Sequence, residues 1–190
     1  MTQSQRSASQ HSHHSFDVAV HRLQGGDVVA ELEPVRPGAD LSGFIERSFQ
    51  SILSTLTLRD LCDETARVFK DLTGYDRVMV YRFDPDGHGE VFSEQREEHL
   101  EAYLGNRYPA SDIPQIARRL YETNRIRLLV DVAYQAVPLI AGDDATQDGQ
   151  LDMSLCALRS VSPIHIQYLK NMGVSATLVV SLMAGGSLWG

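Results

Sequence analysis

Short apolar runs separated by polar turn signals divide the chain into segments with strand or helix periodicity. Residues 16–23 and 28–32 alternate apolar and polar positions on either side of a Gln-Gly-Gly-Asp turn, which predicts a β-hairpin. Apolar residues then recur at helical spacing and predict a first helix over about residues 41–55.

A second helix is predicted to begin at Thr57, whose side chain can cap it, and to end at Gly74, which suits a left-handed position. The remaining segments are, in chain order, a strand over 76–83, a turn over 84–89, a strand through 91–92, a helix over 113–123, a strand over 126–132, an acidic polar loop over 140–150, a helix over 162–172, a strand over 175–183 and a turn at 185–186. Strands and helices do not alternate regularly, so the predicted fold class is α+β, a central antiparallel sheet with flanking helices.

The two ends of the chain differ from this pattern. Residues 1–15 are rich in Ser, Gln and His without apolar periodicity, which predicts a disordered polar tail. The alternative is a metal held by His11, His13 and His14. At the other end a strand begins at Ser187 and the chain stops within it, so we expect an unpaired sheet edge or a domain cut short of its natural end.

Composition narrows the classes of function. The 190 residues are 43% hydrophobic, enough to bury one core, and carry a net charge of −8. This charge argues against nucleic acid and anionic membranes as partners. No apolar run approaches the ~18 residues that span a bilayer, and a cytoplasmic protein is expected. Cys62 and Cys156 lack metal-ligand spacing and are expected to be buried thiols.

Residues 108–114 and 162–173 each combine a rigid backbone start with polar side chains in apolar sequence, as the lining of a ligand pocket does. Ser162 followed by proline is a strong helix start, which places His165 in the first turn and Tyr168 on the same face. The helix dipole and burial both disfavour the charged imidazole, so we predict a mainly neutral His165. A hydrogen-bonded core histidine is the alternative.

Two prolines fix the backbone around Asp112 and favour a set direction for its carboxylate and its carbonyl. Alternatively, Ser111 or Asp112 caps the helix that follows, and the two roles are compatible. Arg127, on an apolar strand, and Arg159, ahead of the His165 helix, are candidates for holding carboxylates bidentately. Ordinary edge charges or salt bridges are the alternative for both.

Catalytic motifs are missing from the sequence. There is no GxSxG, HExxH or P-loop pattern, and Gly87 with Gly89 lacks the third glycine of a dinucleotide fingerprint. The acidic pairs are typical of solvated surface. The sequence therefore indicates a binding protein and not an enzyme.

Residues 74–83, 108–114, 159–173 and 185–190 closely resemble the chromophore-binding GAF domain of bacterial phytochromes. The resemblance covers about residues 40–190, and residues 16–34 resemble the last hairpin of the PAS domain that precedes this GAF domain. It implies a red and far-red photoreceptor fragment from a two-component signalling lineage. The implied cofactor is biliverdin, a linear tetrapyrrole, and the implied partners are a histidine kinase or other phytochrome modules and a second copy of the chain.

By position, the resemblance also implies a role for each candidate residue. Asp112 would bond the pyrrole nitrogens through its carbonyl and the output arm through its carboxylate, with Ile113 and Pro114 beside it. His165 would lie beside the rings, and Ser162 would hydrogen-bond nearby. The residues that would meet the two propionates are Arg127 and Arg159, and those that would line the isomerising ring are Tyr81, Tyr108 and Tyr168.

The sequence departs from the family at the attachment sites. The cysteine that precedes the histidine in cyanobacterial and plant relatives is replaced by Ile164, and no cysteine stands before Cys62, although bacterial members carry theirs upstream of the PAS domain. We therefore expect no covalent attachment. Thr177 and Val179 stand where relatives often place propionate-binding serines, and the family's next strand would begin after Gly190.

Two interpretations of function follow. The first is a photoreceptor fragment in which bilin binding is noncovalent or impaired. The second is a GAF interaction module that dimerises through exposed helices or an open sheet edge. A cyclic-nucleotide site is disfavoured, because the tyrosines and paired arginines suit a tetrapyrrole better. The expected organisation is a tail over 1–15, a residual PAS-type hairpin over 16–34 and a C-terminally truncated GAF domain over 40–190.

Overall fold

The computed structural model describes residues 15–23, 25–140 and 151–190. The predicted polar tail and the predicted acidic loop therefore lie almost wholly outside the described residues, and His11, His13 and His14 lie outside them altogether. The chain divides into two units, residues 1–39 and residues 40–190, and each is described by itself.

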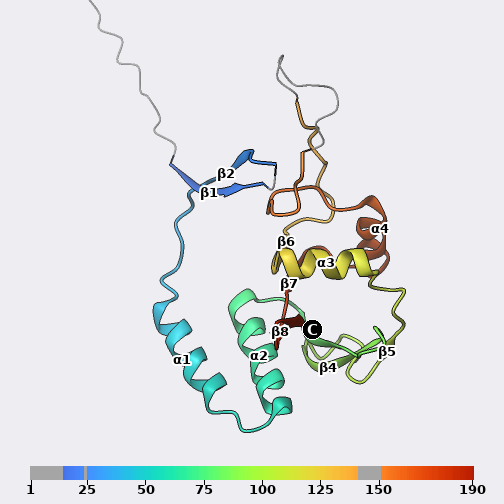
Figure 1. Cartoon of the computed structure of the whole chain (residues 1–190). Helices are drawn as coiled ribbons and strands as arrows, with labels where there is room; N and C mark the ends of the chain where they lie inside the picture. Colours follow the sequence, from blue (N-terminus) through green and yellow to red (C-terminus); the bar gives the residue numbers. More distant parts are fainter. Residues whose placement is uncertain (1–14, 24, 141–150) are drawn as a thin grey trace, which may run out of the picture. The chain divides into compact units, whose positions relative to one another are not determined.

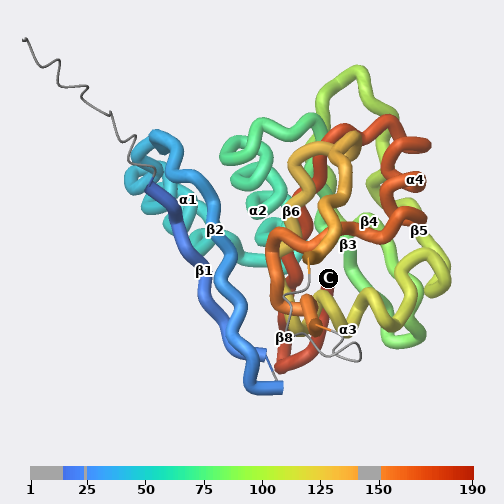
Figure 2. Tube along the Cα trace, turned by 90° about the horizontal axis from the view of Figure 1, so that it is seen from above, coloured from blue at the N-terminus to red at the C-terminus, as the bar shows by residue number. Residues whose placement is uncertain are grey.

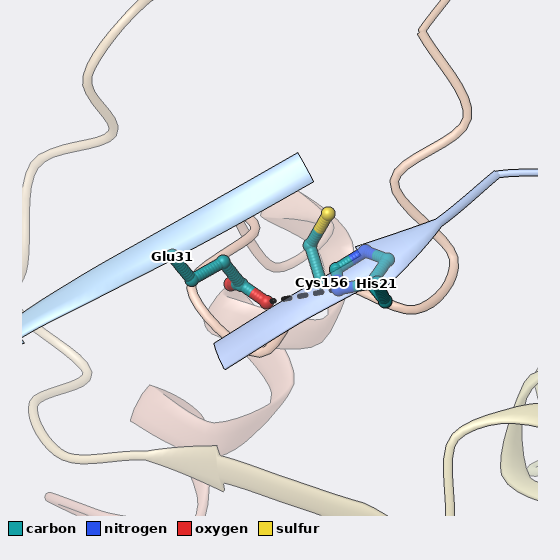
Figure 3. Close-up of side chains that lie close together, drawn as sticks. All are labelled: His21, Glu31 and Cys156. Carbon is teal, nitrogen blue, oxygen red and sulfur yellow. Dashed lines mark ion pairs between the residues drawn. The ribbon is translucent and has the colours of Figure 1, made fainter. Parts of the chain in front are cut away.

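The described part of the smaller unit is a β-hairpin, drawn in blue in Figure 1. Strands β1 (Phe16–Arg22) and β2 (Val28–Pro34) pair antiparallel, as the alternating pattern predicts. His21 and Glu31 lie diagonally across the two strands, with Nδ1 3.9 Å from Oε1 (Figure 3). When the imidazole is protonated, this contact is an ion pair between the strands.

The larger unit contains the remaining helices and strands. In chain order these are α1 (Ser42–Leu53), α2 (Leu58–Thr73), β3 (Arg77–Phe83), β4 (Gly89–Arg96), β5 (Arg107–Tyr108), α3 (Gln115–Thr123), β6 (Ile126–Leu129), α4 (Pro163–Asn171), β7 (Thr177–Val180), β8 (Met183–Ala184) and β9 (Ser187–Leu188).

Local signals place the ends of α2 as predicted. The Thr57 side chain accepts a hydrogen bond from the N–H of Asp60 at 3.1 Å, which satisfies one of the free donors of the first turn. Gly74 has a φ of +67° and donates its N–H to the carbonyl of Lys70 at 2.8 Å. The cap and the left-handed stop are therefore both confirmed.

The antiparallel sheet is interrupted and consists of the groups β3-β4-β5, β6-β7 and β8-β9. The N–H of Phe83 donates to Trp189 at 2.9 Å and links the first group to the last, while the N–H of Ser181 donates to Arg125 at 2.8 Å and extends the pairing of β6 with β7. The last residues of the chain thus connect β3 to β8, and the end of the chain lies in the middle of the larger unit in both views (Figures 1 and 2). The predicted α+β architecture with an antiparallel sheet and flanking helices is confirmed.

Two strand boundaries differ from the prediction. The strand expected over 126–132 ends at Leu129, because the Asp131 side chain accepts the N–H of Ala133 at 2.7 Å and turns the chain. The strand expected over 175–183 is divided into β7 and β8, because the N–H of Leu182 donates to Gly190 instead of continuing the pairing with β6.

Two hydrophobic clusters hold the larger unit together. The first lies between α2 and one face of β3 and β4, and its buried members are Cys62, Ala66, Val80 and Phe92. The second lies between α4 and β6, and its buried members are Leu129, Val132 and Leu169. Cys62 and Cys156 are only 4% and 2% exposed, which confirms the prediction of buried thiols. None of the helices in the described ranges is long and apolar enough to cross a membrane.

Candidate functional site

Three aromatic rings gather on the face of β3 opposite α2. The Tyr81 ring meets that of Phe83 edge-on with centroids 5.2 Å apart, and it lies 6.1 Å from the ring of Tyr108 on β5. A bulge between Val80 and Tyr81 shifts the strand register at this point. Tyr81 and Tyr108, both candidates from the sequence, are therefore neighbours, and Phe83 is a further member of the group.

Gly89 makes room for this cluster. In the β4 register it stands opposite both Phe83 and Tyr108. A Cβ at this position would lie 2.5 Å from Cε1 of Tyr81 and 2.6 Å from the carbonyl oxygen of Arg82, closer than side-chain atoms pack. The absence of a side chain at Gly89 thus allows the Tyr81 ring to cover the strand.

The loop that carries Asp112 runs from β5 to α3. The N–H of Asp112 donates to the carbonyl of Pro109 at 3.1 Å, so the loop contains a tight turn, and the Asp112 side chain is exposed. The predicted helix start at Ile113 is wrong: α3 begins at Gln115 with Pro114 as its N-cap, because a residue that precedes proline disfavours helical backbone.

The N-terminus of α3 also corrects the capping alternative. No side chain caps this helix, and Pro114 instead accepts the N–H of Ala117 at 2.9 Å through its carbonyl. The carboxylate of Asp112 contacts only its neighbour among the described residues, at 3.5 Å from Oγ of Ser111. The charge of Asp112 is therefore available to a ligand, while Ile113 is half-buried beside it.

Helix α4 presents His165 and Tyr168 side by side. Their rings stack with an interplanar angle of 22° and centroids 6.2 Å apart, as their spacing on one helical face predicts. Partial desolvation lowers the pKa of His165, and the positive charge of Arg127 lowers it further. The direction agrees with the predicted neutral imidazole, although a cationic neighbour and not the helix dipole is the second cause.

Ser162 stands at the predicted N-cap of α4, but its hydroxyl makes no capping hydrogen bond. Its carbonyl accepts the N–H of Ile166 at 3.0 Å. Pro163 is the first helical residue, where its missing N–H costs the helix no hydrogen bond. The exposed hydroxyl of Ser162 is therefore free to bond elsewhere.

Arg127 and Arg159 lie near each other, one on β6 and one ahead of α4. Both line a cavity of about 10 Å³ together with Cys156 and Val161. Desolvation lowers the pKa of Arg159, and the charge of Arg127 lowers it further. Neither guanidinium forms an ion pair with a carboxylate within the described ranges. The carboxylate of Asp152 acts on Arg159 from a longer range and partly offsets its charge. Two neighbouring cations without a direct ion pair favour an anionic ligand.

Electrostatic effects connect the aromatic cluster on β3 and β5 with the rings on α4. Desolvation raises the pKa of Tyr168, and Tyr108 and Asp112 raise it further. Desolvation likewise raises the pKa of Tyr81, with Arg118 opposing the shift and Asp112 adding to it. Tyr168 is thus within electrostatic range of Tyr108 and Asp112, and its stacked neighbour His165 is within range of Arg127, so the α4 rings connect the aromatic end of the candidate site to its cationic end.

One open groove of about 590 Å³ lies elsewhere, between α1, α2 and β4. Its lining residues are Ser51, Ser54, Thr55, Leu56, Asp60, Asp63, Glu64, Arg67 and Gln95. None of the residues singled out from the sequence lines this groove. It is mostly polar and acidic, so it offers no alternative site for an anionic ligand.

Comparison with known proteins bears on this site. The family model of the GAF domain matches residues 57–190. The chain is 52% identical over 140 residues to a bacteriophytochrome of Pseudomonas aeruginosa, which covers 74% of this chain and 18% of that protein. It is 42% identical over 181 residues to cyanobacterial phytochrome B of Nostoc sp., which covers 93% of this chain and 24% of that protein.

Solved structures agree with these sequence matches. The chromophore-binding domain of Stigmatella aurantiaca phytochrome P1 has a TM-score of 0.85 at 39% identity, and the match covers 92% of this chain and 58% of that one. The chain spans about a quarter or less of the length of the two phytochromes above.

Proposed function

Since this chain belongs to the GAF domain family, we propose that it binds a linear tetrapyrrole, biliverdin, without a covalent bond and serves as the sensing part of a red and far-red photoreceptor. The observation that carries the proposal is the pairing of Arg127 and Arg159 at one end of a site whose other end is aromatic. The similarity to phytochromes supports it.

The donor set fits such a cofactor. A tetrapyrrole of this kind carries two propionates, and two neighbouring arginines that form no direct ion pair within the described ranges offer bidentate bonds to them. Its rings are flat and apolar, and the tyrosines on β3, β5 and α4 offer aromatic surface. When bound, the cofactor supplies visible absorption and a double bond that light isomerises.

Each remaining candidate has a proposed task. Asp112 accepts hydrogen bonds from the pyrrole N–H groups through its carbonyl, and its exposed carboxylate is left for an output segment. His165, held neutral, both donates and accepts beside the rings. Ser162 contributes its hydroxyl, which makes no capping hydrogen bond to α4, and Ile113 and Pro114 pack against the edge of the tetrapyrrole rings.

The proposal of noncovalent binding rests on the burial of both cysteine thiols. Cys62 and Cys156 are 4% and 2% exposed, and burial raises the pKa of Cys62, so its nucleophilic thiolate is disfavoured. The position before His165, where cyanobacterial and plant relatives attach their chromophore, is the 83% exposed Ile164. The expected cytoplasmic location, two-component lineage and histidine kinase partner remain predictions from the resemblance.

The test is reconstitution with biliverdin. We expect a red-shifted absorbance band that changes under alternating red and far-red light, and loss of the pigment on denaturing gels. Asp112→Ala and His165→Ala should weaken the band or its light response, whereas the exposed loop residue His99 gives a matched control, His99→Ala. A wild-type protein without a band, or site variants with unchanged spectra, would contradict the proposal.

A GAF interaction module is the second candidate, favoured by α1. Ile45, Phe49 and Leu53 follow one another four residues apart on this helix and are 48%, 62% and 75% exposed. An apolar stripe of this kind suits a homodimer. Sedimentation of wild type and Phe49→Ser decides: a concentration-dependent dimer lost in the variant supports this candidate, and a monomer at all concentrations rejects it.

A further inference from the structure

One arginine of α3 contacts the backbone on both sides of Asp112. Nε of Arg118 donates to the carbonyl of Ile113 at 2.9 Å, and Nη2 lies 3.4 Å from the carbonyl of Ala110. The same Nη2 donates to the carbonyl of Gly87 in the β3–β4 turn. A single guanidinium therefore joins the Asp112 loop to a turn that lies 31 residues away from Arg118 in the sequence.

The surroundings of Arg118 are shaped for this contact. Its guanidinium carbon lies 4.7 Å from the centroid of the Phe83 ring, in cation–π range. Gly87 has a φ of +86°, and a Cβ there would lie 2.9 Å from Nη1 of Arg118. A glycine at this position thus provides both the turn conformation and the space that the guanidinium occupies.

The contact matters because the loop has few other supports. Among the described residues, the bond from Asp112 to Pro109 is its one internal main-chain bond, the bond from the Ser111 hydroxyl to the Asp112 carboxylate is long at 3.5 Å, and Asp112 is exposed. Carbonyls that accept from a charged donor are held more firmly than those that accept from a neutral one. Lysine cannot replace the arginine, because a single ammonium lacks the fixed fork that reaches three carbonyls.

We propose that Arg118 is the positioning residue for Asp112: it fixes the direction of the carbonyl and carboxylate that this residue offers to the bilin. Arg118 contacts the loop and not the ligand, so the effect on bilin binding rests on the proposed function, whereas the contact with the loop does not. It makes the β3–β4 turn part of the support of the site, although none of its residues lines the site.

The first test uses the protein without bilin. Amide hydrogen exchange is measured for Asp112 in wild type, Arg118→Met, Arg118→Lys and the control Arg119→Met, which changes an exposed neighbour on the same helix. Loss of a charge-assisted bond should speed exchange by about tenfold in both Arg118 variants. An exchange rate that matches wild type in folded Arg118→Met overturns the proposal.

The second test measures biliverdin binding to each variant after circular dichroism has shown that the variant is fully folded. In folded protein, the loss of a residue that only stabilises the fold would not change the affinity. We expect about tenfold weaker binding and a displaced red band for Arg118→Met and Arg118→Lys, and wild-type values for Arg119→Met. Faster loop exchange with unchanged affinity and spectrum overturns the positioning role. A wild-type protein that shows no band contradicts the proposed function, while the exchange result still decides the loop contact.

Discussion

Replacing Gly89 with alanine tests how the aromatic cluster is built. The added Cβ would lie 2.5 Å from Cε1 of Tyr81 and 2.6 Å from the carbonyl oxygen of Arg82. The ring can turn away, but the carbonyl belongs to the strand, so the pairing of β3 with β4 must open next to Phe83. The variant should therefore disturb both the sheet and the position of Tyr81.

The magnitude follows from three contributions. Overpacking costs about 1–3 kcal/mol, and the loss of one or two strand hydrogen bonds costs about 1–2 kcal/mol. The reduced entropy of the unfolded chain returns about 0.4–1 kcal/mol. We expect Gly89→Ala to lower the free energy of unfolding by about 1–5 kcal/mol, or the melting temperature by roughly 2–20 °C.

Urea denaturation followed by circular dichroism measures this change, and Gly43→Ala is the matched control. Gly43 lies in α1, where a Cβ would approach only the flexible end of Arg47 at 3.3 Å. Alanine should there stabilise the helix by about 0.5–1 kcal/mol. If Gly89→Ala is as stable as wild type, the close approach of Tyr81 to β4 is wrong.

Three further predictions concern single side chains. Glu94, whose side chain is 3% exposed, pairs with Arg77 at 2.5 Å, so Glu94→Gln should cost about 2–4 kcal/mol in urea denaturation; an unchanged midpoint contradicts this. Ile164→Cys puts an exposed thiol in the first turn of α4 and should retain biliverdin on a denaturing gel, whereas Ile116→Cys, also exposed, should not; equal retention by both refutes the geometry. Because the pKa of His165 is lowered on folding, the unfolded chain binds more protons, so stability should fall as the pH drops below about 6.5. His165→Gln should flatten the dependence of the unfolding free energy on pH between 7.5 and 5.5. An equally steep dependence in this variant contradicts a lowered pKa of His165 as its cause.

Local signals in the sequence predicted the elements whose ends depend on neighbouring residues. Thr57 and Gly74 bound α2 as expected, and the Gly185-Gly186 pair, with φ of +57° and +84°, turns β8 into β9. The short β5 was missed, because two residues carry no periodicity and their pairing with β4 depends on the fold.

The candidate site was predictable only in part. Proline spacing and the α4 helix start drew attention to Asp112 and His165, but the expectation that Arg127 belongs to the same site came from the family resemblance alone. The contact between Arg118 and Gly87 left no signal in the sequence, because it joins segments whose spacing has no periodic pattern. Contacts between distant segments depend on how the sheet is assembled, which local propensities do not encode.

The hydrogen bond from Phe83 to Trp189 can form only late in the synthesis of the chain. Its acceptor is translated 106 positions after its donor, which at bacterial or eukaryotic ribosome speeds corresponds to about 5–20 s. During that interval β3 and β4 can pair and α2 can cover them, but the free edge of β3 near Phe83 has no partner from its own chain. Nascent chains on one messenger therefore present matching unpaired edges to one another, and slower translation of the last residues should increase aggregation during synthesis.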